Sequence, residues 1–281
     1  MASTVAATII VVIGAVLLYG IFNVLRDSSR VETYRRTVRA IRPWMFLTTV
    51  VHIAVLLAAI VALLQVPFLS YGWWKLLGGD GNVLVGQTGF DGIGWQIASL
   101  VIPVGIFVLV PDLAYGEELM FRLGADSMSH IERLQRQVRF GIAHCLMGVP
   151  LAAGIALILS GYYYQAIYLR ALRRLELDVV PAEGVPRPTT KPYPPGPSHT
   201  GSNDEAKLEQ WRLEMARVAT ENEQRITQWY NDYPKLVARQ DRQADALRLE
   251  ALTTAAAAHT VMNWIVVSVI VTSLVIIYVM Y

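Results

Sequence analysis

The chain has 281 residues, of which 54% are hydrophobic and 16% charged, and its formal net charge is +2. A soluble domain of this length does not need so much apolar sequence, so the composition excludes an ordinary soluble globule and is typical of a multi-pass membrane protein. The single cysteine, Cys145, excludes an internal disulfide framework and a zinc site built from several cysteines. No glycine-rich phosphate loop or nucleic-acid-binding signature is present, so we expect no nucleic-acid partner.

The first apolar run, residues 5–25, predicts a membrane-spanning helix. It lacks a basic leader and is longer than the apolar core of a signal peptide, so we expect the helix to be retained. Six arginines follow between residues 26 and 42, against only two acidic residues. By the positive-inside rule this connecting loop lies in the cytoplasm and the N-terminus lies outside.

Two further membrane helices are expected at residues 45–68 and 94–116, with a glycine-rich external loop between them. Residues 128–149 predict one helix whose first half is amphipathic and lines a wet cavity or lies at the interface. An apolar run at 151–169 then returns to the cytoplasmic side. It ends at a second basic cluster: Arg170, Arg173 and Arg174. Both clusters predict the same orientation.

A cytoplasmic insertion is expected at residues 176–251, between the membrane helices of residues 1–175 and a last membrane helix within 252–281. Its first part, 181–203, carries seven prolines and predicts a disordered or polyproline-like linker. Its second part, 204–250, predicts a charged helical arm.

Ser202-x-x-Glu205 is a candidate capping box for this arm, and Pro234 is expected to divide it. Aromatic residues stand among its alternating charges. The arm therefore predicts either a surface for a protein partner or a second copy of the chain, or a solvated helical face. With the arm and six membrane helices, the expected fold is an all-α polytopic transmembrane bundle.

Polar residues interrupt the apolar helices in three places. These motifs are Glu117-Glu118-x3-Arg122, Phe140-x3-His144 and His259-x3-Asn263. Residues four apart lie on one helix face. A charge at bilayer depth costs about 2.5 to 3.5 kcal/mol on insertion scales, so such residues indicate function by default. The predicted topology brings all three motifs to the cytoplasmic side.

These residue types are sufficient for peptide hydrolysis. A carboxylate deprotonates water, imidazoles orient that water or transfer protons, and an amide with a protonated histidine stabilises a tetrahedral oxyanion. The ordered set of three motifs, over residues 95–175 and 252–275, resembles the CAAX-processing and bacteriocin-processing (CPBP) family of intramembrane endopeptidases. That family includes the type II CAAX prenyl endopeptidases.

The resemblance implies a role for each motif residue. Glu117 is expected to activate water, His144 to orient it, and His259 and Asn263 to form the oxyanion site. The supporting residues are the Glu118–Arg122 pair and Phe140. The family has been described both as glutamate-type and as metal-dependent, so we expect either no cofactor or a divalent metal such as zinc held by Glu117, His144 and His259.

The resemblance also implies a membrane-embedded or membrane-tethered peptide or protein substrate, cleaved near the cytoplasmic face, and the short loops suit a bacterial plasma membrane. Three departures stand against it: a short interval between Glu117 and His144, a polar first half of the histidine helix where the family is usually apolar, and the insertion of about seventy residues before His259. The short interval and the insertion favour an alternative, a catalytically silent membrane adaptor that binds a partner through its arm. A second alternative is a small transporter with Glu117 and His144 as a proton relay.

Other polar residues have simpler interpretations. We expect His52 to be a hydrogen-bonded packing histidine, His130 and His199 to be solvated, and Cys145 to fill a small apolar gap. Four tyrosines near a predicted membrane boundary are interpreted as interface anchors rather than a substrate cradle. They are Tyr162, Tyr163, Tyr164 and Tyr168.

Overall fold

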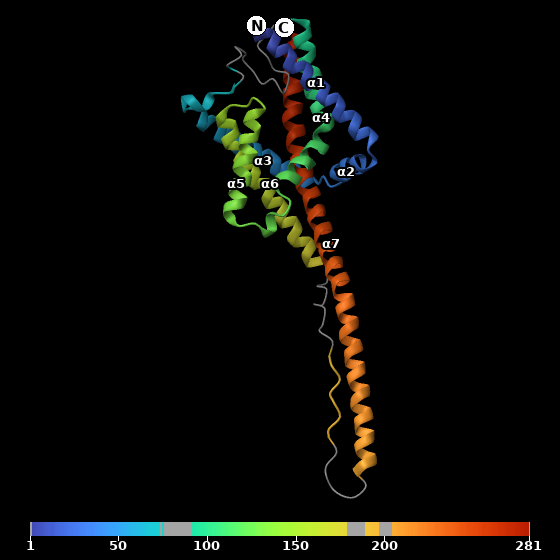
Figure 1. Ribbon diagram of the computed structural model, residues 1–281. Helices are drawn as coiled ribbons and strands as arrows, with labels where there is room; N and C mark the ends of the chain where they lie inside the picture. Colours follow the sequence, from blue (N-terminus) through green and yellow to red (C-terminus); the bar gives the residue numbers. More distant parts are fainter. Residues whose placement is uncertain (1, 74, 76–91, 179–188, 197–203, 281) are drawn as a thin grey trace. The chain divides into compact units, whose positions relative to one another are not determined.

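All regular secondary structure in the described part of the chain is helical, as predicted (Figure 1). The computed structural model describes residues 2–73, 75, 92–178, 189–196 and 204–280. Its helices are α1 (Ala2–Arg26), α2 (Ser28–Arg39), α3 (Pro43–Leu64), α4 (Ile93–Phe121), α5 (His130–Leu146), α6 (Leu151–Asp178) and α7 (Asp204–Met280), with 3-10 turns η1 (Pro67–Ser70) and η4 (Ala125–Ser127). Five of them are long and apolar enough to cross a membrane: α1, α3, α4, α6 and α7.

The chain divides into two compact units. One comprises residues 1–176 and 248–281, and the other comprises residues 177–247. The first unit contains the apolar helices and all three polar motifs, so the candidate site belongs to it alone. Its outward surface carries many exposed large apolar side chains, among them Leu18, Leu47 and Val101. Such a surface is typical of helices that face lipid.

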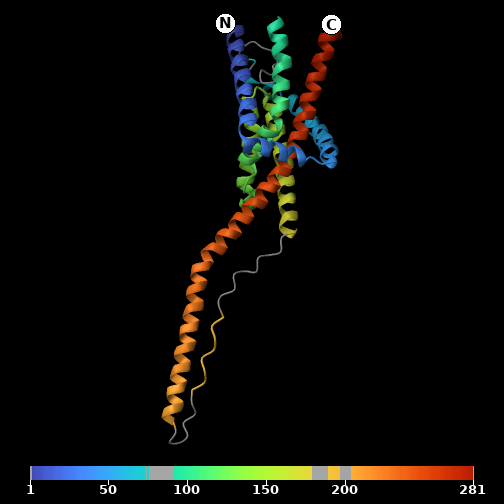
Figure 2. The same cartoon turned by 90° about the vertical axis from the view of Figure 1, so that its right-hand side faces the viewer.

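In the first unit α1 and α2 pack against α4, which Figure 2 shows from a second side. The arginine-rich segment was expected to be a loop, but it forms α2. Its start is capped by Asp27, whose side chain accepts a hydrogen bond from the Ser29 backbone N–H at 2.8 Å. Arg30 pairs with Asp112 of α4 at 2.9 Å. The capping aspartate and the amphipathic pattern therefore stabilise a helix in this segment. The arginines alone had predicted only on which side of the membrane the segment lies.

The remaining core of this unit joins α3, α5, α6 and the later part of α7. Its buried cluster consists of Leu56, Phe140, Ala156, Tyr164 and Met262. Because Phe140 and Tyr164 belong to this cluster, the hydrophobic core and the polar motifs share side chains. Packing of the core therefore fixes the positions of the motif residues.

Helix α5 has 17 residues, about 25 Å of length. It is too polar to count among the candidate spans, yet the turn after it lies beside the chain that follows η1, where the Leu151 N–H donates to the Tyr71 carbonyl at 3.0 Å. One of its polar residues is held inside the bundle: the amide nitrogen of buried Gln137 donates to Gln165 of α6. The structure therefore has five candidate spans in its described part, one fewer than the six membrane helices expected from the sequence, because α5 is too short and too polar to count.

Helices α5 and α6 approach each other almost backbone to backbone. A Cβ atom added at Gly141 would lie 2.3 Å from the Gly154 carbonyl oxygen, and one added at Gly154 would lie 2.2 Å from the Cys145 sulfur. The sulfur therefore fills the gap that the two glycines leave, as expected for a packing cysteine. This close approach sets the position of His144, which lies on the same helix as Gly141.

The helix α7 is a single element, whereas the sequence predicted an arm divided at Pro234 and a separate helix from 252. Pro234 lies inside it. Proline removes one backbone hydrogen bond and costs about 3 kcal/mol in a helix interior, but it does not end this helix. The flanking sequence is rich in Ala, Arg, Gln, Glu and Leu, which are strong helix formers and offset that cost.

Within the second unit, residues 189–196 have neither helix nor strand and lie against α7. The Asn222 side chain accepts from the Lys191 backbone N–H at 2.7 Å and donates to the Lys191 carbonyl at 3.1 Å. The Trp211 indole donates to the Pro194 carbonyl at 3.3 Å. The rest of the predicted linker, with the Ser202 cap, lies outside the described residues.

The glycine contact between α5 and α6 makes a testable prediction. Gly141→Ala places a methyl group against the backbone of α6, so we expect a loss of about 1–3 kcal/mol in the free energy of unfolding. Gly14→Ala in α1 meets nothing within 4 Å and is the matched control. It should be neutral or slightly stabilising, because alanine favours a helix over glycine. Thermal unfolding in detergent measures both, and equal melting temperatures would contradict the packing.

Candidate active site

The three polar motifs meet in the first unit, from three helices. Glu117 and Glu118 lie in the last turns of α4, and Arg122 is the residue that ends this helix. His144 lies in the last turn of α5, and His259 lies within α7. The carboxylates lie deeper in the helix than expected, because α4 continues to Phe121 rather than ending near residue 116.

Glu118 is the buried centre of the cluster. Its Oε1 atom lies 2.9 Å from Nδ1 of His259, and its Oε2 atom lies 3.3 Å from Nε of Arg122. The side chains of Glu118 and Arg122 are fully buried. The guanidinium also lies 4.2 Å from the Phe140 ring centroid and donates to the Gly161 carbonyl at 3.4 Å. Each buried charge thus has an opposite charge or an aromatic face beside it, which offsets its desolvation.

Glu117 faces both imidazoles. Its Oε2 atom is 3.9 Å from Nε2 of His144 and 3.8 Å from Nε2 of His259. The opposite nitrogen of each ring is held: Nδ1 of His144 lies 2.8 Å from the Phe140 carbonyl, which only accepts, and Nδ1 of His259 faces the Glu118 carboxylate. Both Nδ1 atoms therefore carry a proton, and both rings turn Nε2 toward Glu117.

The Glu117 carboxylate and two imidazole Nε2 atoms thus converge from three helices. Separations of 3.8 and 3.9 Å are too long for direct hydrogen bonds and match the spacing of groups joined through one water molecule. A water molecule donates two protons, so it satisfies the Glu117 carboxylate and one imidazole at once. The side chains of Glu117 and His144 are 30% and 19% exposed, whereas that of His259 is 3% exposed. Solvent therefore approaches from the side of Glu117 and His144.

The expected zinc ligands were tested against the same distances. Zinc bonds of about 2.0–2.1 Å put neighbouring ligand atoms roughly 3.4 Å apart, closer than Glu117 lies to either imidazole. In the described ranges, no group of three or more His, Cys, Asp or Glu residues has the arrangement that holds a metal ion. The observed geometry does not fit zinc, and we derive no chemical step through a metal.

Phe140 and Asn263 complete the motifs in different ways. Phe140 is buried and presents its ring to both histidines, with centroid distances of 4.6 Å to His144 and 6.0 Å to His259. Asn263 lies one helical turn after His259 and is half-buried. Its amide makes no hydrogen bond to any described side chain or backbone group. The structure brings Glu117, Glu118, Arg122, Phe140, His144 and His259 into one contact network and leaves the Asn263 amide outside it.

Tyr164 belongs to the site, and the interpretation of it as an interface anchor was wrong. It is 1% exposed, and its ring stacks on that of His259 with a centroid distance of 4.3 Å. Its hydroxyl donates to the Met262 sulfur at 2.8 Å. Tyr168 is also buried, whereas Tyr162 is 40% exposed. The signal was present in the spacing, because residues 164 and 168 share a helix face and residue 162 lies on another.

A second ion pair lies beside the site, just after the end of α4, and nothing in the residue spacing predicted it. Asp126, after α4, accepts two hydrogen bonds from Arg248 of α7, at 2.8 and 3.1 Å, and one from the Tyr168 hydroxyl at 3.1 Å. These contacts join α4, α6 and α7 three helical turns before His259. They restrain α7 where it enters the cluster.

The other histidines agree with their simpler interpretations. Nε2 of His52 lies 2.9 Å from the Ser160 hydroxyl, and its ring stacks on Tyr163 at 4.4 Å. His130 is exposed at the start of α5. His199 lies outside the described residues. Neither His52 nor His130 belongs to the cluster around Glu117.

Comparison of the chain with protein-family models, with curated proteins and with solved structures found no match. A functional assignment therefore rests on the motifs and on the geometry of the site.

The buried pair makes a stability prediction. Arg122→Leu leaves the Glu118 charge buried without its cation, so we expect a loss of about 3–5 kcal/mol in the free energy of unfolding. Glu118→Gln in the same chain removes that charge and keeps an oxygen for Nδ1 of His259. The double variant should therefore be more stable than Arg122→Leu alone, which thermal or denaturant unfolding measures. Additive losses would show that the two side chains do not act as a pair.

Proposed function

We propose that the chain is an intramembrane endopeptidase that hydrolyses a peptide bond in a membrane-embedded or membrane-tethered substrate. The observation that carries the proposal is the position of the Glu117 carboxylate, within one water molecule's reach of two imidazole Nε2 atoms at the end of an apolar helix. A carboxylate and imidazoles around one water are the groups that general acid–base hydrolysis needs. The order of the motifs, which resembles that of the CPBP family, supports the same reaction.

The reaction follows from the placement of the protons. Glu117 accepts a proton from water, and the oxygen of that water forms a bond to the peptide carbonyl carbon. His144, with its Nδ1 proton held by the Phe140 carbonyl, presents Nε2 to the same water and orients it. The proton on Glu117 passes to the amide nitrogen as the C–N bond breaks, which releases a carboxyl group and an amine.

His259 and Asn263 supply the stabilisation of the oxyanion. The Glu118 carboxylate holds Nδ1 of His259 and stabilises the protonated ring, whose Nε2–H then donates to the developing negative charge. Tyr164 stacks on this ring and fixes its plane. The Asn263 amide, one turn further along α7, is the second donor in this scheme. Arg122 and Phe140 act beneath the histidines and position them.

The cytoplasmic location of cleavage is part of the proposal. It rests on the two arginine clusters that flank the apolar helices and on the positive-inside rule. The proposed substrates are peptides of a bacterial plasma membrane, such as leader peptides or membrane regulators. The scheme uses no metal, because Glu117 and the two imidazoles are not spaced as zinc ligands, and a chelator tests for the metal-dependent form.

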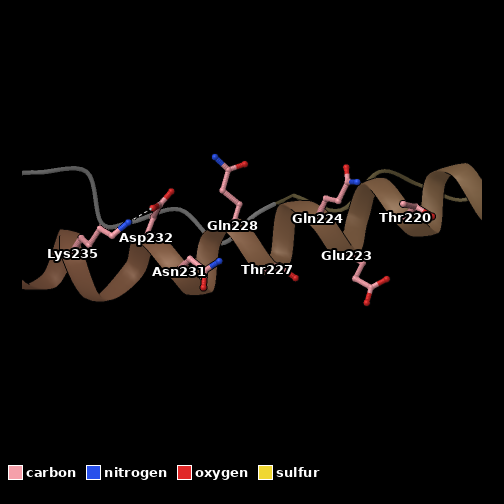
Figure 3. Close-up of a pocket in the computed structure, with 8 residues that line it drawn as sticks. All are labelled: Thr220, Glu223, Gln224, Thr227, Gln228, Asn231, Asp232 and Lys235. Atoms are coloured by element: carbon pink, nitrogen blue, oxygen red, sulfur yellow. Dashed lines mark hydrogen bonds and ion pairs between the residues drawn. The ribbon is translucent and has the colours of Figure 1, made fainter.

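A non-catalytic adaptor is the second candidate, and the helical arm favours it. In the second unit, Tyr230 and Tyr233 are exposed beside Trp229, with ring centroids of Trp229 and Tyr233 4.8 Å apart. The polar face next to them, shown in Figure 3, spans Thr220–Lys235 and holds one ion pair, between Lys235 and Asp232 at 3.2 Å. All residues of that face lie along one helix, which is the arrangement of a helical face exposed to solvent rather than of an enclosed pocket. Transport is less well supported, since the charged groups of the motifs gather at one depth.

The peptide-cleaving activity of a variant without the Glu117 charge tests whether Glu117 is the general base. We expect Glu117→Gln to reduce cleavage of a membrane-tethered reporter peptide library by about 10²-fold or more, because it removes the proton acceptor and keeps the shape. Glu32→Gln, an exposed glutamate of α2, is the matched control and should cleave at the wild-type rate. Cleavage is measured in nanodiscs by mass spectrometry of the products, with and without chelator.

The contrary outcome is defined in the same assay. A folded wild-type protein that cleaves no reporter, together with partner capture that needs residues 204–250 and survives Glu117→Gln, would replace hydrolysis with the adaptor function. Unchanged cleavage by Glu117→Gln would remove Glu117 from the chemistry. Loss of cleavage on chelation would instead assign the metal-dependent form.

A further inference from the structure

Two adjoining cavities, each of about 470 Å³, lie in the first unit away from the candidate active site. The first is lined by the last part of α2, the start of α3, the last part of α6 and the middle of α7. Its charged lining residues are Arg36, Arg39, Arg42, Arg174 and Glu250. The second extends along the apolar part of α3 and α6. Its lining includes Trp44, Tyr163, Ala166 and Ile167. Trp44, Ala171, Arg174 and Thr254 line both, so the two cavities form one continuous site.

The first cavity carries four guanidinium groups against one carboxylate. In the described part of the chain, Arg36, Arg39 and Arg174 form no ion pair with any acidic side chain, and neither does Glu250. Guanidinium groups bind phosphate through paired hydrogen bonds. The lining therefore fits a phosphate or another compact anion, which no described residue supplies to these three arginines.

The second cavity adds an apolar region directly beside these charges. Trp44 and Tyr163 are side chains that typically lie where a membrane helix meets water. Arg42 immediately precedes the apolar helix α3, and Arg174 follows the apolar run of α6. The charged cavity thus lies at the end of the membrane-spanning helices, and the apolar cavity continues toward their interior. A ligand that fills both has an anionic head and a hydrocarbon chain.

We propose that this site binds an anionic phospholipid, with its phosphate among Arg36, Arg39 and Arg174 and an acyl chain against Trp44 and Ile167. The proposal is independent of the proposed hydrolysis, since none of these residues touches Glu117, His144 or His259. A free phosphate ion shares the head-group chemistry but leaves the apolar cavity unused, so the lipid is the occupant that matches both cavities. Bound lipid joins α2, α3 and α6 at one end of the unit.

Two charge-matched variants test the site. Arg36→Gln/Arg174→Gln removes two cavity arginines, and Arg35→Gln/Arg173→Gln removes two exposed arginines that are their sequence neighbours and line neither cavity. Both lose the same charge from the same helices. The purified full chain in detergent is titrated with phosphatidylglycerol, phosphatidylcholine or inorganic phosphate. Native mass spectrometry measures bound lipid, and thermal unfolding measures stabilisation by each ligand.

We expect wild type to bind phosphatidylglycerol more tightly than phosphatidylcholine, and the cavity variant to lose roughly 30-fold in affinity, from about fivefold for each basic residue near a lipid head group. The control variant should bind as wild type does. Ile167→Ala, at a residue that lines only the apolar cavity, should weaken phosphatidylglycerol binding and leave stabilisation by inorganic phosphate unchanged. This split supports a lipid.

Three outcomes would overturn the proposal. Equal losses in the two double variants would show an effect of total charge, and equal binding of the two lipids would remove the role of the arginines. Stabilisation by inorganic phosphate as strong as that by phosphatidylglycerol would assign the cavity to a free anion. If the cavity variant fails to fold, Arg39→Gln alone carries the same comparison, because this exposed arginine lines only the charged cavity.

Discussion

The ion cluster of Glu118, Arg122 and His259 is the constraint on which the first unit depends. Its carboxylate and guanidinium are fully buried, and the imidazole is nearly so. Each charge removed from water needs its partner, so α4 and α7 have one arrangement in which the cluster is satisfied. The aromatic rings of Phe140 and Tyr164 enclose it from α5 and α6. The core of the bundle therefore packs around charges, and the same contacts point Nε2 of His259 at Glu117.

Glu117 and Glu118 have different roles because they differ in burial. Glu118 is enclosed and paired, so its role is to hold a histidine. Glu117 is partly exposed and has imidazoles on two sides, with no direct hydrogen bond to its buried oxygen in the described part of the chain. Neighbours in a helix point about 100° apart, which is how one turn of α4 serves both a structural and a chemical role. The pair Asp126–Arg248 restrains α7 on the approach to this turn.

Much of the site was predictable because its residues obey helical spacing in apolar sequence, where polar side chains stand out. Glu118 and Arg122 are four residues apart, and they do form a pair. Contacts between distant parts of the chain were not predictable. Nothing in one sequence joins Asp126 to Arg248, and the contact of Tyr164 with His259 required knowing which face of α6 is turned inward.

The fold shows the same limit. Apolar runs of about twenty residues predicted the membrane helices, because length and composition decide that question. The helix α2 and the continuity of α7 through Pro234 depend instead on capping and on neighbouring helix formers, which act locally and outweigh the charge pattern or a single proline. The sequence predicted that the polar first half of α5 lines a wet cavity or lies at the membrane interface. In the structure Gln137 is instead buried in the bundle, where its amide nitrogen donates to Gln165.

The coupling of Glu117 to both imidazoles is the central claim, and nitrogen-15 NMR of the histidine rings tests it most directly. The account predicts that His144 and His259 carry their proton on Nδ1, and that Glu117→Gln shifts the Nε2 resonances of both while leaving those of His52 in place. Protons on Nε2 in both rings, or Nε2 resonances that do not respond to Glu117→Gln, would contradict a single site built from these three residues.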